Sequence, residues 1–236
     1  MSYPFCIVFG VLPSIIWLCF YLRKDVHPES NPMVIKIFFY GALIALPAIF
    51  LEIGIFSVIG ELKFLPSIVT VLNTFLGVAL VEEVLKYLVV REKVLNSPEF
   101  DEPIDAMLYM IIVALGFAAV ENILILFGLA PTFLIVEALS ISLFRFLGAT
   151  FLHALVSGTV GFFIAISLFE TKRRNQIITF GLGLAILLHG LYNFAIMKIE
   201  GNLKLLILSI IIIGLAVFVS LGFKRLQKLA SVCKIS

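Results

Sequence analysis

The sequence predicts an all-α, polytopic integral membrane protein. Of its 236 residues, 62% are hydrophobic and only 14% are charged, whereas soluble proteins average roughly 45–50% apolar and about 25% charged residues. The 23 Phe residues outnumber the 17 Lys and Arg residues, which leaves too few polar side chains for a water-facing surface. The net charge of +2 and the three Cys residues argue against a nucleic-acid-binding protein and a secreted disulfide scaffold.

Seven apolar windows are long enough to cross a bilayer, which requires roughly 20 mostly apolar residues per helix. Together they predict a single transmembrane helical domain over residues 1–236. The windows run over Pro4–Leu22, Val34–Gly60, Pro66–Val90, Ile104–Ala130, Phe146–Phe169, Ile177–Met197 and Leu203–Phe223. The apolar segment Pro131–Arg145 carries Glu137 and Arg145 and is too short for another independent span. We expect it to be a re-entrant or interfacial segment, or a long lead-in to the fifth helix.

The basic residues predict the orientation, because Lys and Arg accumulate in cytoplasmic loops. With the N-terminus outside and the C-terminus in the cytoplasm, three basic residues fall outside and twelve fall on the cytoplasmic side. The twelve are Arg23, Lys24, Lys36, Arg91, Lys93, Lys172, Arg173, Arg174, Lys224, Arg225, Lys228 and Lys234. This asymmetry supports seven crossings of the cell membrane.

Ionisable side chains within the third and fourth windows are candidate functional residues, because each costs roughly 2.5–3.5 kcal/mol near the bilayer centre. Lys86 follows Glu82 by four residues and Glu83 by three, so it can pair with either carboxylate on one helix face. Glu121 has no basic neighbour on its own helix. The structural alternatives are a helix end held by an internal ion pair, and a protonated Glu121 hydrogen-bonded to another helix.

The fifth and sixth windows each contain a histidine followed by a polar residue four positions later. Ser157 follows His153 and Asn193 follows His189, so each pair lies on one helix face. A lone intramembrane histidine is usually a hydrogen-bonded packing residue. Here, however, four successive helices each supply a group that can bind metal or move protons, which predicts a shared intramembrane cavity.

Two chemistries fit these residue types. Histidines with one or more glutamates are the ligands of a catalytic zinc site that keeps a position open for water. Alternatively, Glu82 or Glu83 acts without metal as a general base for an attacking water, while the histidines and Asn193 stabilise the oxyanion. Adjacent helix residues point about 100° apart, so we expect Glu82 and Glu83 to have different roles.

These residues, in this order, resemble the PrsW family of intramembrane proteases, which is related to the CAAX-prenyl protease and bacteriocin-processing superfamily. The matching motifs are Glu82-Glu83-x-x-Lys86, the run Gly116–Asn122, His153, and His189-x-x-x-Asn193. The resemblance extends from about Pro13 to Asn193, with a catalytic core at about 66–197.

The resemblance implies an intramembrane endopeptidase that cleaves a membrane-anchored protein, an anti-sigma factor in the best-known relatives. It implies that Glu82 and Glu83 are catalytic carboxylates, and that Glu121, His153 and His189 are metal ligands, with zinc as the candidate ion, or transition-state stabilisers. Asn193 completes the catalytic set, and Lys86 and Asn122 support it. The related superfamily also admits a metal-free glutamate mechanism.

Two other functions remain open from the sequence. Buried Glu, Lys and His also build the proton relays of proton-coupled transporters, although such carriers usually have pseudo-symmetric halves with broken helices, which this sequence does not show. A non-catalytic membrane scaffold could retain the same polar network for folding alone.

Overall fold

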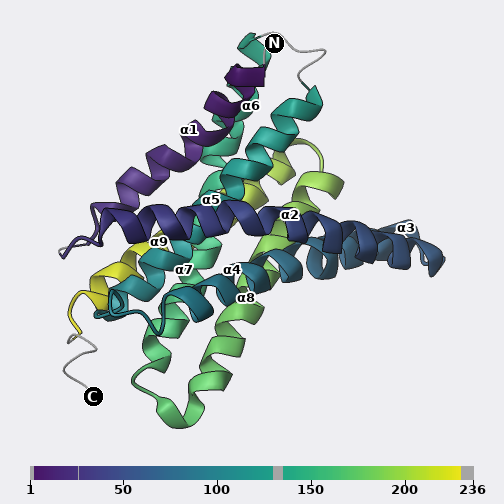
Figure 1. The fold of residues 1–236 in the computed structure, drawn as a ribbon. Coiled ribbons are helices and arrows are strands. Elements are labelled where there is room, and N and C mark those ends of the chain that lie inside the picture. The colour runs from purple at the N-terminus through teal and green to yellow at the C-terminus, as the bar shows by residue number, and fades with distance from the viewer. Residues whose placement is uncertain (1–2, 26, 130–134, 230–236) are drawn as a thin grey trace.

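The computed structural model describes residues 3–25, 27–129 and 135–229. These residues form helices and no strands, so the predicted all-α fold is confirmed (Figure 1). Seven helical stretches are long and apolar enough to cross a membrane. The helices are α1 (Tyr3–Leu22), α2 (Asn31–Glu61), α3 (Pro66–Leu72), η1 (Asn73–Leu80), α4 (Val81–Lys93), α5 (Pro103–Leu129), α6 (Ile135–Leu147), α7 (Ala149–Ser167), η2 (Thr171–Arg173), α8 (Arg174–Lys198) and α9 (Gly201–Leu226).

Helix α5 forms the centre of the bundle and is packed against α1, α2 and α7. Every residue from Pro103 to Ala119 is buried, as expected for a helix that is apolar on all sides. Large apolar side chains on α2 and α9 instead remain exposed at the periphery, for example Phe50 and Ile213. This distribution is that of a protein whose outer surface faces lipid.

Two glycines allow α2 to cross α5 at backbone contact. A Cβ atom added to Gly41 would lie 2.0 Å from the carbonyl oxygen of Val113, and one added to Gly116 would lie 2.0 Å from that of Phe38. Small residues of this kind let membrane helices approach closely. The crossing fixes the position of α2 beside α5, and α2 forms one wall of the cavity described below.

The third span is not a continuous α-helix, because residues Asn73–Leu80 form the π-helical segment η1 between α3 and α4. The Thr74 hydroxyl donates to the carbonyl oxygens of Thr70 and Val71 at 2.9 and 3.1 Å. Gly77 packs closely against the ring of Phe56 on α2. Irregular turns of this type often adjoin functional sites, and here η1 directly precedes the pair Glu82 and Glu83.

The segment 131–145 had three possible interpretations from the sequence. Residues 131–134 lie outside the described residues, but Ile135–Leu147 form α6, which continues into α7 after a break at Gly148. Helices α6 and α7 together make one long span, which agrees with a lead-in to the fifth crossing. The segment begins eleven residues before the predicted window at Phe146.

The connections between spans lie at two opposite ends of the bundle. In Figure 1 the α1–α2, α4–α5 and α7–α8 connections lie along the left and bottom of the view, while the α8–α9 connection lies at the upper right and the start of α3 at the far right. The connections in the described part of the chain alternate between these two ends, as successive membrane crossings require. The first set of connections and the helix ends beside it carry seven basic residues, against three at the opposite set, which predicts that the first set faces the cytoplasm.

Candidate functional site

A cavity of about 460 Å³ lies between α2, the third span and α5–α8. Its lining includes five ionisable residues of the apolar windows, together with Arg145 and Asn193; the five are Glu52, Glu82, Glu121, His153 and His189. The predicted convergence of four successive helices on one intramembrane cavity therefore agrees with the structure.

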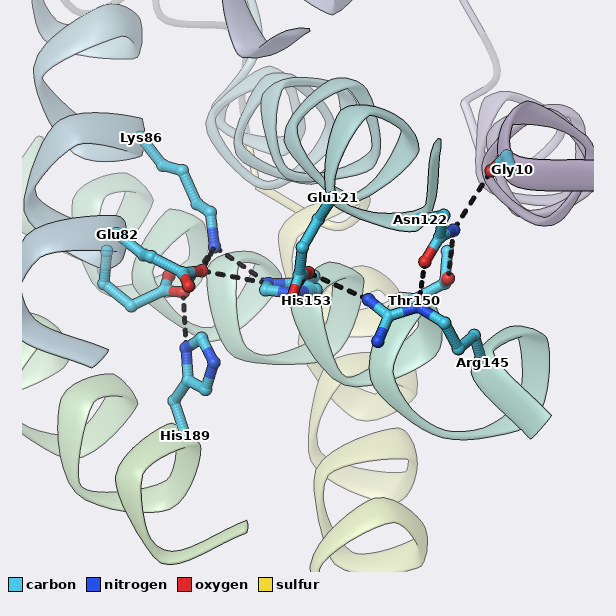
Figure 2. Close-up of polar contacts among 10 residues, drawn as sticks. Gly10, Glu82, Lys86, Glu121, Asn122, Arg145, Thr150, His153 and His189 are labelled. Carbon is cyan, nitrogen blue, oxygen red and sulfur yellow. Dashed lines mark hydrogen bonds and ion pairs between the residues drawn. The ribbon is translucent and has the colours of Figure 1, made fainter. Parts of the chain in front are cut away.

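Lys86 is the central cation of the site and is fully buried. Its ammonium group donates to Glu82 Oε2 at 3.1 Å and to Glu83 Oε1 at 2.8 Å, and lies 2.9 Å from His153 Nδ1 (Figure 2). An ammonium group has three donors and no acceptor, so these contacts use all of them. The same group lies 4.5 Å from the ring centre of Phe117. Both possible pairings of Lys86 predicted from the sequence are thus present together.

His153 connects Lys86 to the second acidic group of the site. Because its Nδ1 faces the Lys86 ammonium, this nitrogen must accept a hydrogen bond, which places the ring proton of neutral His153 on Nε2. That Nε2 lies 2.9 Å from Glu121 Oε2, and the same oxygen is 3.0 Å from Arg145 Nη2. Glu121 therefore finds its cation on α6 rather than on its own helix.

Arg145 and Asn122 tie this part of the site to the surrounding helices. The Nε–H of Arg145 donates to the side-chain oxygen of Asn122. The amide nitrogen of Asn122 donates to the backbone oxygen of Gly10 at 3.1 Å and to the Thr150 hydroxyl at 3.0 Å. As Figure 2 shows, the chain of contacts runs from α1 through α5 and α6 into the cavity.

Glu82 and Glu83 occupy different environments, as their angular separation predicts. Glu83 does not line the cavity, and its two oxygens receive Lys86, His189 Nδ1 at 3.0 Å and the Ser157 hydroxyl at 2.8 Å. Glu82 lines the cavity and accepts a hydrogen bond from Lys86. Glu83 is thus held by three donors, while Glu82 faces the space where a substrate would lie.

Four of these buried side chains match the donor set of a metal site. Ligand atoms of Glu82, Glu83, His153 and His189 all lie within 4.8 Å of one another. Imidazole nitrogen and carboxylate oxygen are zinc ligands, so donor type and spacing fit that ion. This set differs from the expected Glu121, His153 and His189. The Glu121 carboxylate meets His153 at Nε2 and is already paired with Arg145.

Two ionisable residues that line the cavity, Arg145 and Glu52, were not among the predicted site residues. Arg145 was treated only as a charge within a short apolar segment, and its partner on α5 could not be read from the sequence. Glu52 lies within the second apolar window. The free-energy cost of an ionisable group in the membrane, which identified Glu121 as a candidate, would also have identified Glu52. It lines the cavity from α2, opposite a site that already contains three other carboxylates.

Comparison with known proteins gives a consistent family. The model of a family described as PrsW family intramembrane metalloprotease matches residues 29–222. Protease PrsW of Geobacillus kaustophilus (strain HTA426) is 31% identical over 192 residues, covering 81% of this chain and 79% of that protein. Protease PrsW of Bacillus subtilis (strain 168) is 32% identical over 188 residues, covering 78% and 79%.

A more distant relative covers slightly more of the chain. Protease PrsW of Clostridioides difficile (strain 630) is 26% identical over 213 residues, covering 86% of this chain and 84% of that protein. No solved structure matches the chain. Because the family model matches residues 29–222, which is most of the sequence, and the described residues include seven helices long and apolar enough to cross a membrane, this chain belongs to the PrsW family of multi-pass membrane proteases.

Proposed function

We propose that this protease is an intramembrane endopeptidase that hydrolyses a peptide bond of a membrane-anchored protein at the cavity lined by Glu82, His153 and His189. The observation that carries the proposal is the meeting of these three buried groups in one cavity of about 460 Å³. Intramembrane ionisable groups are costly, and a packing role alone does not explain why three helices direct them to a common space.

Glu82 is the general base in this proposal. It takes a proton from a water molecule, and the water oxygen attacks the carbonyl carbon of the substrate to form a tetrahedral oxyanion. When the carbon–nitrogen bond breaks, Glu82 returns the proton to the leaving amine. A base must lie within hydrogen-bond reach of its water, and Glu82 is the member of the carboxylate pair that lines the cavity.

The neighbouring groups orient and stabilise this reaction. Glu83, held by Lys86, Ser157 and His189, fixes the imidazole of His189 with its proton on Nδ1. The side chain of Asn193 lines the same cavity and supplies an amide donor for the developing oxyanion, while Lys86 and Glu121 hold the ring of His153 beside it. Zinc, if held by three of the side chains Glu82, Glu83, His153 and His189, would keep one position open, and would there polarise the substrate carbonyl and acidify a bound water.

The substrate bond is inferred to lie near the middle of the membrane, because Glu82 lies eleven residues before the end of its span at Lys93, or roughly 17 Å at 1.5 Å per residue, and this end is predicted to face the cytoplasm. Glu121 and His189 lie eight and nine residues before the ends of their helices at Leu129 and Lys198, or roughly 12 and 14 Å at 1.5 Å per residue. With the orientation that the basic residues predict, these ends face outside. The family resemblance implies a single-pass substrate of the anti-sigma-factor type. The helix that anchors such a protein crosses the bilayer, so part of it lies at this depth.

The test is co-expression of the full-length chain with single-pass candidate substrates. We expect cleavage by the wild type, and a loss of at least about 100-fold in Glu82→Gln, which removes the base without changing the side-chain shape. Glu61→Gln, an exposed carboxylate at the end of α2, is the matched control and should cleave normally. The proposal is wrong if a folded Glu82→Gln protein cleaves at the wild-type rate.

Comparing Glu83→Gln with Glu82→Gln separates a residue that holds the site together from the residue that acts as the base. Because Glu83 receives three donors, its replacement should lower both stability and cleavage, whereas Glu82→Gln should lower cleavage with little loss of stability. Stability is followed by the fluorescence of Trp17, the only tryptophan. Equal stability losses in the two glutamine variants would contradict the assignment of different roles.

A further inference from the structure

Lys86 occupies the centre of the side-chain cluster that matches a metal site. Its ammonium nitrogen lies 3.1 Å from Glu82, 2.8 Å from Glu83 and 2.9 Å from His153, and these are three of the four candidate metal ligands. The fourth, His189, contacts the same Glu83 oxygen that receives Lys86. The cluster therefore already contains a cation, supplied by the chain itself.

A metal ion and this ammonium group need the same lone pairs. Zinc ligand atoms lie about 2.0–2.2 Å from the ion, so an ion bound to Glu82, Glu83 and His153 would occupy the region where the Lys86 ammonium lies. His153 Nδ1 accepts from Lys86 and its Nε2 is taken by Glu121, so neither nitrogen is available without breaking a hydrogen bond. A zinc ion and the Lys86 ammonium placed side by side in this buried cluster would also repel each other strongly.

We propose that Lys86 and a divalent transition-metal ion are alternative occupants of the cluster formed by Glu82, Glu83, His153 and His189. Lys86 lowers the metal affinity of the cluster, and metal binds there only when the Lys86 side chain withdraws. The proposal concerns the cation in the cluster and is independent of the peptide-bond hydrolysis proposed above. Loss of cleavage in a variant therefore neither supports nor opposes it.

The direct test measures zinc binding to the purified full-length protein in detergent micelles. Lys86→Met keeps the side-chain length and removes the charge, and it should bind one zinc ion at least about 100-fold more tightly than the wild type, because a competing cation is gone and His153 Nδ1 is freed. Lys86→Arg retains the charge and should stay near the wild-type affinity. Lys36→Met, an exposed lysine on α2, is the control for loss of one positive charge.

A second substitution locates the new site. Adding His153→Ala to Lys86→Met should abolish the gain in zinc affinity, because it removes one of the four ligands. Affinity is measured by competition with a chelating dye, and bound zinc is counted by elemental analysis after dialysis. Equal zinc affinities of wild type and Lys86→Met would overturn the proposal, and so would a gain that survives His153→Ala.

The proposal stays testable if Lys86→Met does not fold. Lys86→Gln, which retains amide donors toward the two glutamates, is then compared with the wild type under the same expectation. Equal zinc affinities of the wild type and Lys86→Gln would refute the competition.

Discussion

Replacing Gly41 by alanine should destabilise the protein, although alanine is normally the better helix former. The added methyl group would lie 2.0 Å from the carbonyl oxygen of Val113, whereas ordinary contacts begin at 3.4 Å. The two helices must therefore separate by more than an ångström where α2 crosses α5. Overpacking of this kind costs about 1–3 kcal/mol, which exceeds the roughly 0.5–1 kcal/mol that alanine gains over glycine in a helix.

Gly54 provides a matched control on the same helix. A methyl group added there meets nothing within 4 Å, so Gly54→Ala should be neutral or slightly stabilising. Both substitutions carry the same gain in helix propensity. The difference between their free energies of unfolding therefore isolates the clash at the crossing, and we expect it to be about 1–3 kcal/mol.

The assay is unfolding in mixed micelles with increasing SDS, followed by the fluorescence of Trp17. This indole stacks on Phe151 with ring centres 3.8 Å apart and donates to the backbone oxygen of Phe146 at 2.8 Å, so it reports on the packing of α1 against the α6–α7 span. The reasoning fails if Gly41→Ala unfolds at the same SDS fraction as Gly54→Ala.

Three further outcomes follow from single side chains. Arg145→Met should reduce kcat about 10–100-fold with little change in KM, because Glu121 loses its cation and no longer holds His153; Arg145→Lys should restore part of the rate in the same cleavage assay. Glu52→Gln should raise the midpoint of SDS unfolding, because among the described residues the Glu52 carboxylate shows no hydrogen bond or ion pair and faces other acids; a lower midpoint would contradict this. Burial raises the pKa of Glu29, in the α1–α2 connection, to about 7. The folded protein then holds a proton that the unfolded chain releases at lower pH, so stability should fall as pH rises from about 4.5 to 7, and Glu29→Gln should flatten this dependence in unfolding titrations.

The number of spans was predictable because a lipid-facing helix must be apolar over a fixed length. Local departures from a regular α-helix within a span were not predictable. The π-helical segment Asn73–Leu80 has no distinct hydrophobic period, and its irregularity coincides with close packing of Gly77 against Phe56. The sequence also left the role of Pro131–Arg145 open, because this segment is too short for an independent span and carries Glu137 and Arg145. A lead-in to the fifth span was one of three alternatives, and helix packing decides among them.

The sequence predicted that the polar side chains of the site converge, because an unpaired ionisable group in the membrane costs free energy. It did not predict which of these side chains pair with one another. Glu121, His153 and His189 each had to find a polar partner inside the membrane, and their helices follow one another in the chain. The partner of Glu121, however, is Arg145 on α6, a choice made by helix packing. Spacing placed Lys86 beside Glu82 and Glu83, but it could not show that His153 completes the same ammonium contact.

The charges of the site suggest how one cavity can be both stable and reactive. Lys86 and Arg145 supply two positive charges to four carboxylates at Glu52, Glu82, Glu83 and Glu121. Pairing lowers the cost of placing Glu83 and Glu121 in the membrane, and these two residues also fix the imidazoles of His189 and His153. Glu82 shares the Lys86 ammonium with Glu83, which has two further hydrogen-bond donors. Glu52 has no cationic partner among the described residues. The negative charge that remains therefore lies on groups lining the cavity, where a proton from water, a cationic group or a metal ion would be received.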